Sequence, residues 1–169
     1  MKDADFNKAT EMANAKFAEL HTHIGSICSG FADVEMELIN AIGLLVDDGD
    51  LDVGEIVADR LSYSQTVDLF ERLAKHRLKK NPPRELPRLV ADLRKAAALR
   101  NDVIHSSWLC SLGEKPTLYQ ERVRRKHTRR QQSAGTIPLA QFPKIGKFIH
   151  DLFMALQDFE TEYPVFGQQ

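Results

Sequence analysis

The stretch Ala96–Trp108 holds the side chains of this chain that are best suited to acid–base and phosphate chemistry. Arg100, Asn101 and His105 fall within about a turn and a half of a predicted helix. Because a helix advances about 100° per residue, Asn101 and His105 share one face and Arg100 lies slightly to one side. An imidazole can transfer protons near neutral pH, and a guanidinium donates several coplanar hydrogen bonds to phosphate oxygens. Together these side chains could bind a phosphodiester and move a proton beside it.

The apolar residues upstream of Arg100 indicate that its charge needs a partner. They form one helical stripe, made of Leu86, Leu89, Leu93 and Ala96 or Ala97, which continues beyond Arg100 to Ile104. An arginine at the end of such a stripe is costly unless an anion pairs with it. Glu35 interrupts the apolar stripe of an earlier predicted helix in the same way, so we expect Glu35 to pair with Arg100. The alternative is that Glu35 lies at the margin of its stripe and reaches water.

The segment Arg-Asn-Asp-Val-Ile-His, residues 100–105, resembles the Arg-x4–6-His signature of the HEPN superfamily. These all-helical domains include many metal-independent endoribonucleases, and in them a polar residue, often Asn, follows the arginine, as Asn101 does. The motif spans six residues, and the helical layout extends the resemblance over most of the chain, apart from an insertion after Trp108. The resemblance implies catalytic roles for Arg100, His105 and Asn101, with Glu35 as an acidic residue on an early helix and no cofactor or metal.

Two other readings of these residues remain open. Arg122 and His127 form a second pair with a permitted spacing, but they lie in a basic run that has no apolar stripe. The pair Arg100 and His105 could also be a capped helix end with a surface histidine, which requires no chemistry at all. The position of Arg100 at the end of an amphipathic helix is the one feature that distinguishes the Arg100 and His105 pair from the Arg122 and His127 pair.

A basic run follows the motif and is the candidate RNA-binding segment. Its cations are Arg122, Arg124, Arg125, Lys126, Arg129 and Arg130. Such a run would meet a phosphate backbone first, although runs of this kind are usually mobile, solvated loops. Trp108 and Tyr119 could stack on bases, but packing is the expected role of Trp108.

Composition favours one soluble domain over residues 1–169. The chain is 43% hydrophobic and 28% charged with a net charge of −1, so any surface for nucleic acid must be local. Cys28 and Cys110 lack metal spacing and indicate a reducing compartment. We expect no signal peptide, no membrane span and a cytoplasmic location.

Hydrophobic periodicity predicts an all-α fold, an antiparallel up-and-down bundle of about five helices with a β-hairpin inserted before the last helix. The predicted helices are 4–23, 26–46, a helix to about Leu78 capped by Ser64, one from Leu86 or Pro87 through the motif, and Pro138–Tyr163. A break at Gly25 and Ser26 is optional, and Leu51–Leu61 is either a strand or one helical turn. The insertion, 108–137, combines strands Trp108–Leu112 and Thr117–Val123 with the basic loop. Asp47–Asp50 lacks the register of a calcium loop.

Two functions from different classes fit these features. The first is a HEPN-type endoribonuclease, which implies a toxin or defence component with a cognate antitoxin or a nucleotidyltransferase-type protein as partner. The resemblance also implies a homodimer that brings two motifs together, and the wide apolar face of the last helix favours such a contact. The second is a non-catalytic HEPN-like module that dimerises or binds a partner protein. An open cleft containing both Arg100 and His105 would favour the first.

Overall fold

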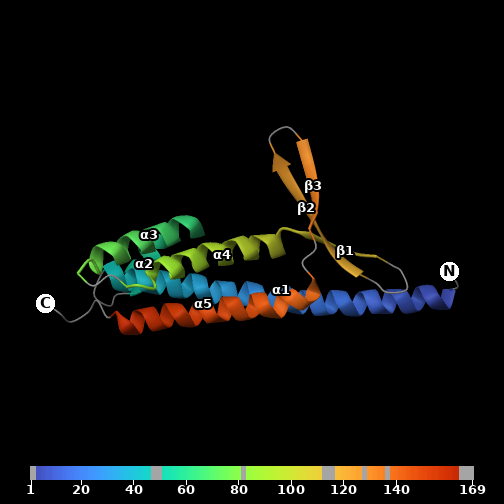
Figure 1. Cartoon of the computed structure of the whole chain (residues 1–169), viewed down its shortest axis with the longest axis horizontal. Coiled ribbons are helices and arrows are strands. Elements are labelled where there is room, and N and C mark those ends of the chain that lie inside the picture. Colours follow the sequence, from blue (N-terminus) through green and yellow to red (C-terminus); the bar gives the residue numbers. More distant parts are fainter. Residues whose placement is uncertain are drawn as a thin grey trace. The chain divides into compact units, whose positions relative to one another are not determined.

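The computed structural model describes residues 3–46, 51–80, 83–111, 117–126, 129–135 and 138–163. Its helices are α1 (Asp3–Val46), α2 (Leu51–Ala58), α3 (Tyr63–Arg77), α4 (Leu86–Ile104) and α5 (Phe142–Glu162). Between α4 and α5 lie strands β1 (Ser107–Ser111), β2 (Thr117–Lys126) and β3 (Arg129–Gly135), followed by a 3₁₀ turn, η1 (Leu139–Gln141). Figure 1 shows this order. The predicted helical bundle with a β insertion before its last helix is therefore confirmed.

The chain divides into two compact units, and α1, α4 and α5 each contribute residues to both. Unit 1 consists of Met1–Cys28 and Arg100–Gly146, and unit 2 consists of Ser29–Leu99 and Lys147–Gln169. Arg100 is thus the first α4 residue of unit 1. The assignment of residues 1–169 to one domain stays a prediction.

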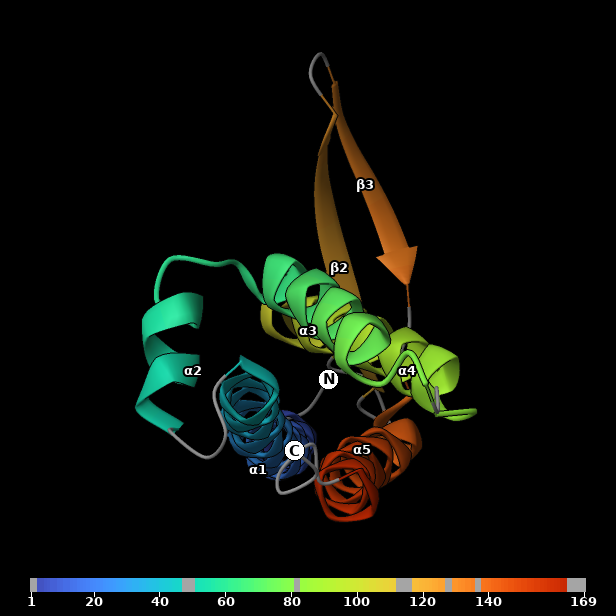
Figure 2. The same ribbon diagram turned by 90° about the vertical axis from the view of Figure 1, so that its left-hand side faces the viewer.

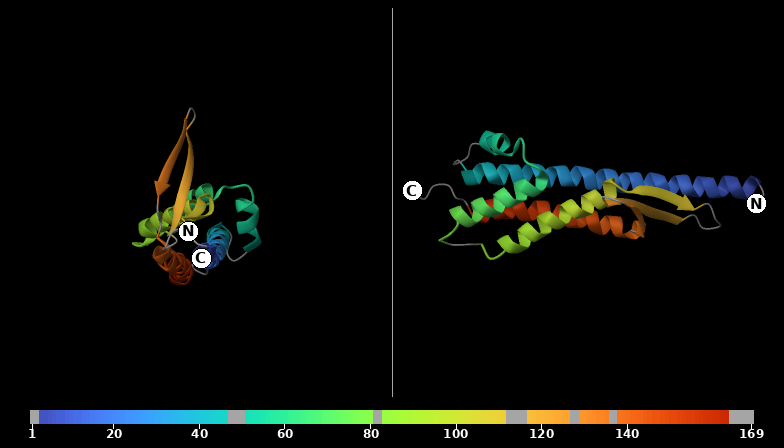
Figure 3. Two further views of the ribbon diagram at one scale, coloured as in Figure 1. Left: turned by 90° about the vertical axis from the view of Figure 1, so that its right-hand side faces the viewer. Right: turned by 90° about the horizontal axis from the view of Figure 1, so that it is seen from above.

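Unit 2 is a helical bundle in which α3, α4 and α5 alternate in direction (Figures 1 and 3). Its core is apolar and includes Val34, Leu38, Ile42, Val67, Phe70, Leu93, Ile149, Leu156 and Phe159. The rings of Phe70 and Phe159 meet edge to face with centroids 5.3 Å apart. Burying each large apolar side chain contributes about 1.5–3 kcal/mol, so this core supplies most of the stabilisation of the unit.

Two arginines connect the helices of unit 2 through polar contacts. Arg94 of α4 donates to Asp68 at 2.7 Å and to Glu71 at 2.9 Å, both on α3. Arg77, in the last turn of α3, donates to the carbonyl oxygens of Leu45 at 2.8 Å and Val46 at 2.7 Å. These carbonyls lie at the end of α1 and have no partner within the helix, so Arg77 caps α1 from outside.

Helix α2 lies on the outer side of α1 (Figure 2), where the sequence left the choice between a strand and a helical turn open. The contact is between backbones: a Cβ at Gly54 would meet the carbonyl oxygen of Ile39 and would lie 3.0 Å from the Cα of Gly43. Glycine lets the two helices approach this closely. The other side of α2 is apolar but open, with Ile56 74% and Val57 38% exposed.

The N-cap of helix α3 lies two residues before Ser64, which was wrongly predicted as the cap. Ser62 is the N-cap, and its hydroxyl accepts a hydrogen bond from the Gln65 amide, while the Gln65 side chain accepts one from the Ser62 amide at 2.8 Å. This reciprocal arrangement needs a Gln or Glu three residues after the cap. Ser62 meets that condition, whereas the residue three after Ser64 is Val67.

In unit 1, α1 continues through Gly25 without a break, so the two helices predicted before residue 46 are one. Ala9, Ala13, Leu20 and Ile27 are buried, whereas the larger apolar residues Phe6 and Met12 are 46% and 40% exposed. The small alanines, which carry little hydrophobic signal, mark the packed face here.

The insertion is a three-stranded antiparallel sheet in the order β1-β2-β3. β2 pairs with β1 over its first half and with β3 over its second half, so β2 and β3 form a two-stranded ribbon that extends beyond β1 (Figure 1). The prediction of a basic loop after the strand Thr117–Val123 is therefore wrong for residues 124–126 and 129–130, which lie in strands, while residues 127–128 are outside the described residues. This run has few β-branched or aromatic residues, so its strand formation depends on backbone pairing with a neighbour.

The structure also bears on the expectations for the last helix, for the loops and for membrane spans. α5 buries Phe142, Ile145, Ile149, Leu152, Leu156 and Phe159, so most of its wide apolar face packs within the chain. The turn at Gly113–Pro116, His127 and the acidic stretch Asp47–Asp50 lie outside the described residues. Within the described residues, no helix is both long enough and apolar enough to cross a membrane.

Candidate functional site

The end of α4 belongs to unit 1 and is held by side chains from the segments that follow it. The Ser106 hydroxyl and the Gln120 amide nitrogen both donate to the Asp102 carbonyl oxygen, the latter at 2.6 Å, and Gln120 also contacts the Ser106 hydroxyl. The Trp108 indole N–H donates to the Val103 carbonyl oxygen at 3.3 Å. Because the last carbonyls of a helix have no partner within it, these bonds replace a glycine cap and fix the end of α4 to β2.

Arg100, Asn101 and His105 come together at this end, as their spacing predicts. The Arg100 guanidinium is half-buried, and its Nη1 donates to the Asn101 side-chain oxygen at 3.2 Å. Asn101 and His105 are exposed, and the His105 backbone N–H donates to the Asn101 carbonyl at 3.0 Å. The three residues therefore lie within about a turn and a half, and Asn101 and His105 are open to solvent.

An aromatic cluster packs beneath the motif segment in unit 1. Phe142 is buried, with its ring centroid 5.4 Å from that of Trp108 and 5.8 Å from that of His23. Trp108 is half-buried and uses its N–H on the backbone, so packing is its role in this structure. Tyr119 lies on β2, and its side chain is outside the described part of the chain.

Glu35 lies in unit 2, whereas Arg100 lies in unit 1, so the expected pairing of these two residues stays a prediction. Within its own unit the half-buried Glu35 is close to Tyr63. Burial of the Tyr63 hydroxyl raises its pKa above the ordinary value, and the Glu35 carboxylate raises it further. The Tyr63 hydroxyl donates to the Leu93 carbonyl at 3.3 Å, which accounts for its burial.

The six basic residues of the candidate RNA-binding run lie on β2 and β3. The register places Arg125 opposite Arg130 and Lys126 opposite Arg129, while Arg122 and Arg124 precede them on β2 at alternate positions. Like charges on opposite positions destabilise a strand pair.

Sequence reasoning missed Gln120, a polar residue that is 1% exposed and holds the motif in place. It stands 18 residues from Asp102, and no local pattern marks it, because its role arises only when β2 lies beside the end of α4. Ser106, the polar residue that follows His105, donates its hydroxyl to the helix backbone.

A groove lies elsewhere, in unit 2 between α4 and α5, and includes neither Arg100 nor His105. Among the residues that the structure describes, no group of three or more His, Cys, Asp and Glu side chains could hold a metal ion. Asn101 and His105 thus lie on an exposed helix end rather than in that groove.

Comparison of the chain with models of known protein families, with curated proteins and with solved structures gives no match. The function of the α4 end must therefore be argued from its own residues.

Proposed function

We propose that this chain is a metal-independent endoribonuclease of the HEPN type, which cleaves single-stranded RNA through the 2′-hydroxyl. The observation that supports this most is the exposed end of α4. There the Arg100 guanidinium lies 3.2 Å from Asn101, and an exposed His105 follows after one turn. The bonds from Ser106, Gln120 and Trp108 already satisfy the helix end, so a purely structural role for Asn101 and His105 is not needed.

In the proposed reaction His105 takes the proton of the 2′-hydroxyl, and the 2′-oxygen attacks phosphorus. The bond from phosphorus to the 5′-oxygen breaks, and a general acid protonates the leaving oxygen, which gives a 2′,3′-cyclic phosphate and a 5′-hydroxyl. Arg100 donates hydrogen bonds to the phosphoryl oxygens as negative charge grows there. Asn101 orients the guanidinium, and Glu35 would assist if it pairs with Arg100. A second histidine, from another copy of the chain, serves as the acid.

RNA binding is assigned to the β2–β3 ribbon, which lies in the same unit as the motif. In a strand, alternate positions are about 6.8 Å apart, so Arg122, Arg124 and Lys126 repeat along β2 at an even spacing. Replacing Arg124, Arg125, Arg129 and Arg130 with Gln removes four charges. The slope of log affinity against log salt should then flatten by up to about 3, at about 0.7 per phosphate contact on a single strand.

The decisive experiment measures cleavage of single-stranded RNA in excess EDTA by the purified chain. We expect products that end in a 2′,3′-cyclic phosphate or its 3′-phosphate, and we expect His105→Ala to abolish cleavage while the melting temperature stays nearly unchanged. His76→Ala is the matched control, since His76 is an exposed histidine at the C-terminal end of α3, as His105 directly follows the C-terminal end of α4. Cleavage that persists in folded His105→Ala would falsify the assignment.

The homodimer is part of the same proposal, because one motif supplies one histidine. Sedimentation is expected to give about twice 19.2 kDa at micromolar concentration. Because the proposed site needs His105 from both chains, unmodified chains mixed with His105→Ala chains under subunit exchange should lose activity in proportion to the heterodimers that form. If the heterodimers keep half of the activity, each chain carries a complete site of its own.

A second candidate, a non-catalytic module that binds a partner protein such as an antitoxin, is favoured by one observation. Ile56 and Val57 on α2 are exposed apolar side chains in a unit whose core is otherwise well buried. This function predicts that Ile56→Glu with Val57→Glu changes the sedimenting mass or abolishes partner binding. It also predicts that the unmodified chain leaves RNA intact.

A further inference from the structure

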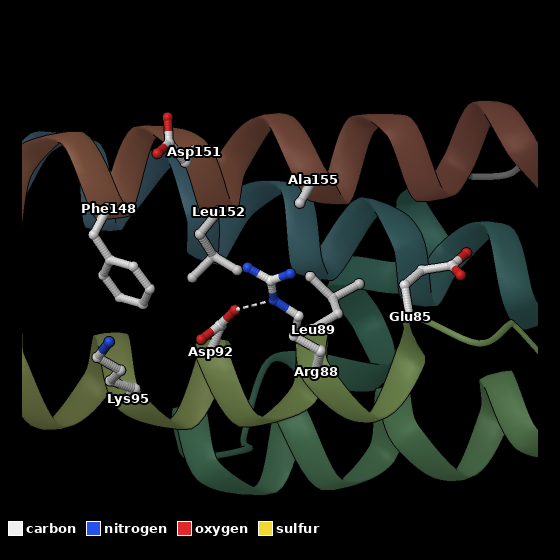
Figure 4. Close-up of a pocket in the computed structure, with 9 residues that line it drawn as sticks. All are labelled: Glu85, Arg88, Leu89, Asp92, Lys95, Phe148, Asp151, Leu152 and Ala155. Carbon is white, nitrogen blue, oxygen red and sulfur yellow. Dashed lines mark ion pairs between the residues drawn. The ribbon is translucent and has the colours of Figure 1, made fainter.

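The groove between α4 and α5 has a volume of about 390 Å³, within the range of small-molecule sites. Leu89 and Leu152, which are 5% and 3% exposed, form its apolar floor. Figure 4 shows that the charged side chains of the groove come mainly from α4, with Lys95 facing Phe148 of α5 at one end. The groove lies wholly within unit 2, so its function does not depend on the proposed ribonuclease site.

Most of the acidic groups around the groove already have partners. Both carboxylate oxygens of Asp151 accept from Lys147 at 2.7 Å, and in Figure 4 this carboxylate points away from the groove. The Glu85 carboxylate interacts with the Tyr163 hydroxyl. Asp92 is 3.7 Å from Arg88, whose side chain is 88% exposed, so this pair is long and weakly constrained. Arg88 can therefore turn toward a ligand at small cost.

Lys95 is placed differently from the other charged groups. Its ammonium lies 4.4 Å from the centroid of the Phe148 ring, and in the part of the chain that the structure describes it contacts this ring rather than a carboxylate. A cation on an exposed ring contributes about 0.5–1 kcal/mol, less than a hydrogen bond to a charged group. An anion that enters the groove would thus give the Lys95 ammonium a partner of opposite charge. When the ammonium leaves the ring, one face of Phe148 becomes free for stacking.

We propose that this groove binds a small organic anion that carries an aromatic ring. The ring lies on the Leu89–Leu152 floor beside Phe148, and the anionic group accepts hydrogen bonds from Lys95, with Arg88 as a second donor. The apolar floor selects for a planar hydrophobic body, and the two cations select for its charge. Binding replaces the cation–π contact of Lys95 with an ion pair while Phe148 keeps an aromatic neighbour.

The test is a titration of the full chain, labelled with ¹⁵N, with 3-phenylpropionate as the probe. Saturable shifts are expected at backbone amides of the groove helices, with a dissociation constant on the order of 1 mM for a ligand of this size. The neutral amide, 3-phenylpropanamide, should bind about three- to fivefold more weakly, since an exposed ion pair adds that much. The saturated analogue, 3-cyclohexylpropionate, should also bind more weakly, because it cannot stack on Phe148.

Two variants separate the charge from the ring. Lys95→Met keeps the aliphatic stem and should abolish the preference for the anion over the amide, whereas Lys79→Met, an exposed lysine outside the groove, should leave it unchanged. Phe148→Leu should abolish the preference for the phenyl over the cyclohexyl probe. Dispersed spectra check that each variant is folded. Equal binding of anion and amide by the unmodified chain, or shifts that never saturate, overturns the proposal.

Discussion

The C-terminal ends of α3 and α4 are stabilised in different ways. The last turn of α3 carries Lys75, His76 and Arg77, three basic residues that interact favourably with the negative end of the helix dipole. The last turn of α4 has no basic residue, and its carbonyls are instead capped by Ser106, Gln120 and Trp108. At the end of α3 the basic side chains serve stability. At the end of α4 the polar cap does so, which leaves Asn101 and His105 exposed without a structural task.

The largest effects are expected when Arg77, at the end of α3, and Arg100, near the end of α4, are replaced, and the two effects should differ in kind. Arg77→Ala removes two charged hydrogen bonds to the end of α1, so it should lower the free energy of unfolding by about 1.5–3 kcal/mol and leave the cleavage rate per folded molecule unchanged. Arg100→Ala should lower the cleavage rate by about 10²–10³-fold, because a donor to the transition state is lost. Chemical denaturation and single-turnover cleavage measure the two quantities. If both variants lost stability alone, the two helix ends would not differ in function.

The cap of α4 can be broken at its buried member. Gln120→Leu keeps the volume but removes the donor to Asp102, so the unfolding free energy should fall by about 1–3 kcal/mol. The proposed ribonuclease activity should fall through its maximal rate rather than through RNA affinity, because Gln120 is buried, holds the end of α4 and is not among the residues proposed to bind RNA. Gln65→Leu, in the cap of α3, is the control that should leave cleavage unchanged. A pure loss of affinity in Gln120→Leu would argue against this positioning role.

Near the end of α5, the side chain that is affected by its surroundings is a carboxylate, that of Glu160. Burial and, to a smaller extent, the nearby Glu37 carboxylate together raise the pKa of Glu160 from 4.5 to about 7, and its Oε1 has no hydrogen-bond partner among the described residues. The folded chain then holds this proton between about pH 4.5 and 7 while the unfolded chain releases it. The stability that protonated Glu160 contributes is full below pH 4.5 and is lost as the pH rises through 7.

Glu160→Gln should therefore be more stable than the parent at pH 8, by about 1–2 kcal/mol after allowance for partial exposure, and nearly equal to it at pH 4.5. Denaturation curves at several pH values measure the difference, with the exposed Glu162→Gln on the same helix as the control. A constant difference across this interval would show that titration of Glu160 does not contribute.

The smallest expected effect lies at the start of α3. Ser62→Ala removes the N-cap and one half of the capping box, which should cost about 1 kcal/mol. Ser64→Ala should cost a few tenths at most, since Ser64 is already inside the helix. Thermal unfolding of the two variants compares the positions directly. Equal losses would mean that the hydroxyl of Ser62 adds nothing to the start of the helix.

The parts of the fold that could be predicted are those whose signal is local. Apolar residues repeat with the helical period in α3, α4 and α5, and the proximity of Arg100, Asn101 and His105 follows from spacing alone. The third strand could not be predicted, because a run rich in Arg and Gln becomes a strand only beside β2. The capping role of Gln120 and the groove between α4 and α5 both depend on contacts between segments far apart in sequence. Such contacts cannot be predicted from the spacing of residues within one helix.

The backbone contact of α2 with α1 also limits how this sequence can change over generations. Any side chain at Gly54 would collide with the Ile39 carbonyl and crowd Gly43, so α2 would have to move outward as a whole. Ile56 and Val57 would move with it. A lineage that uses this apolar face is thus expected to keep glycine at position 54, whereas a lineage that has lost its partner is free to replace all three residues together.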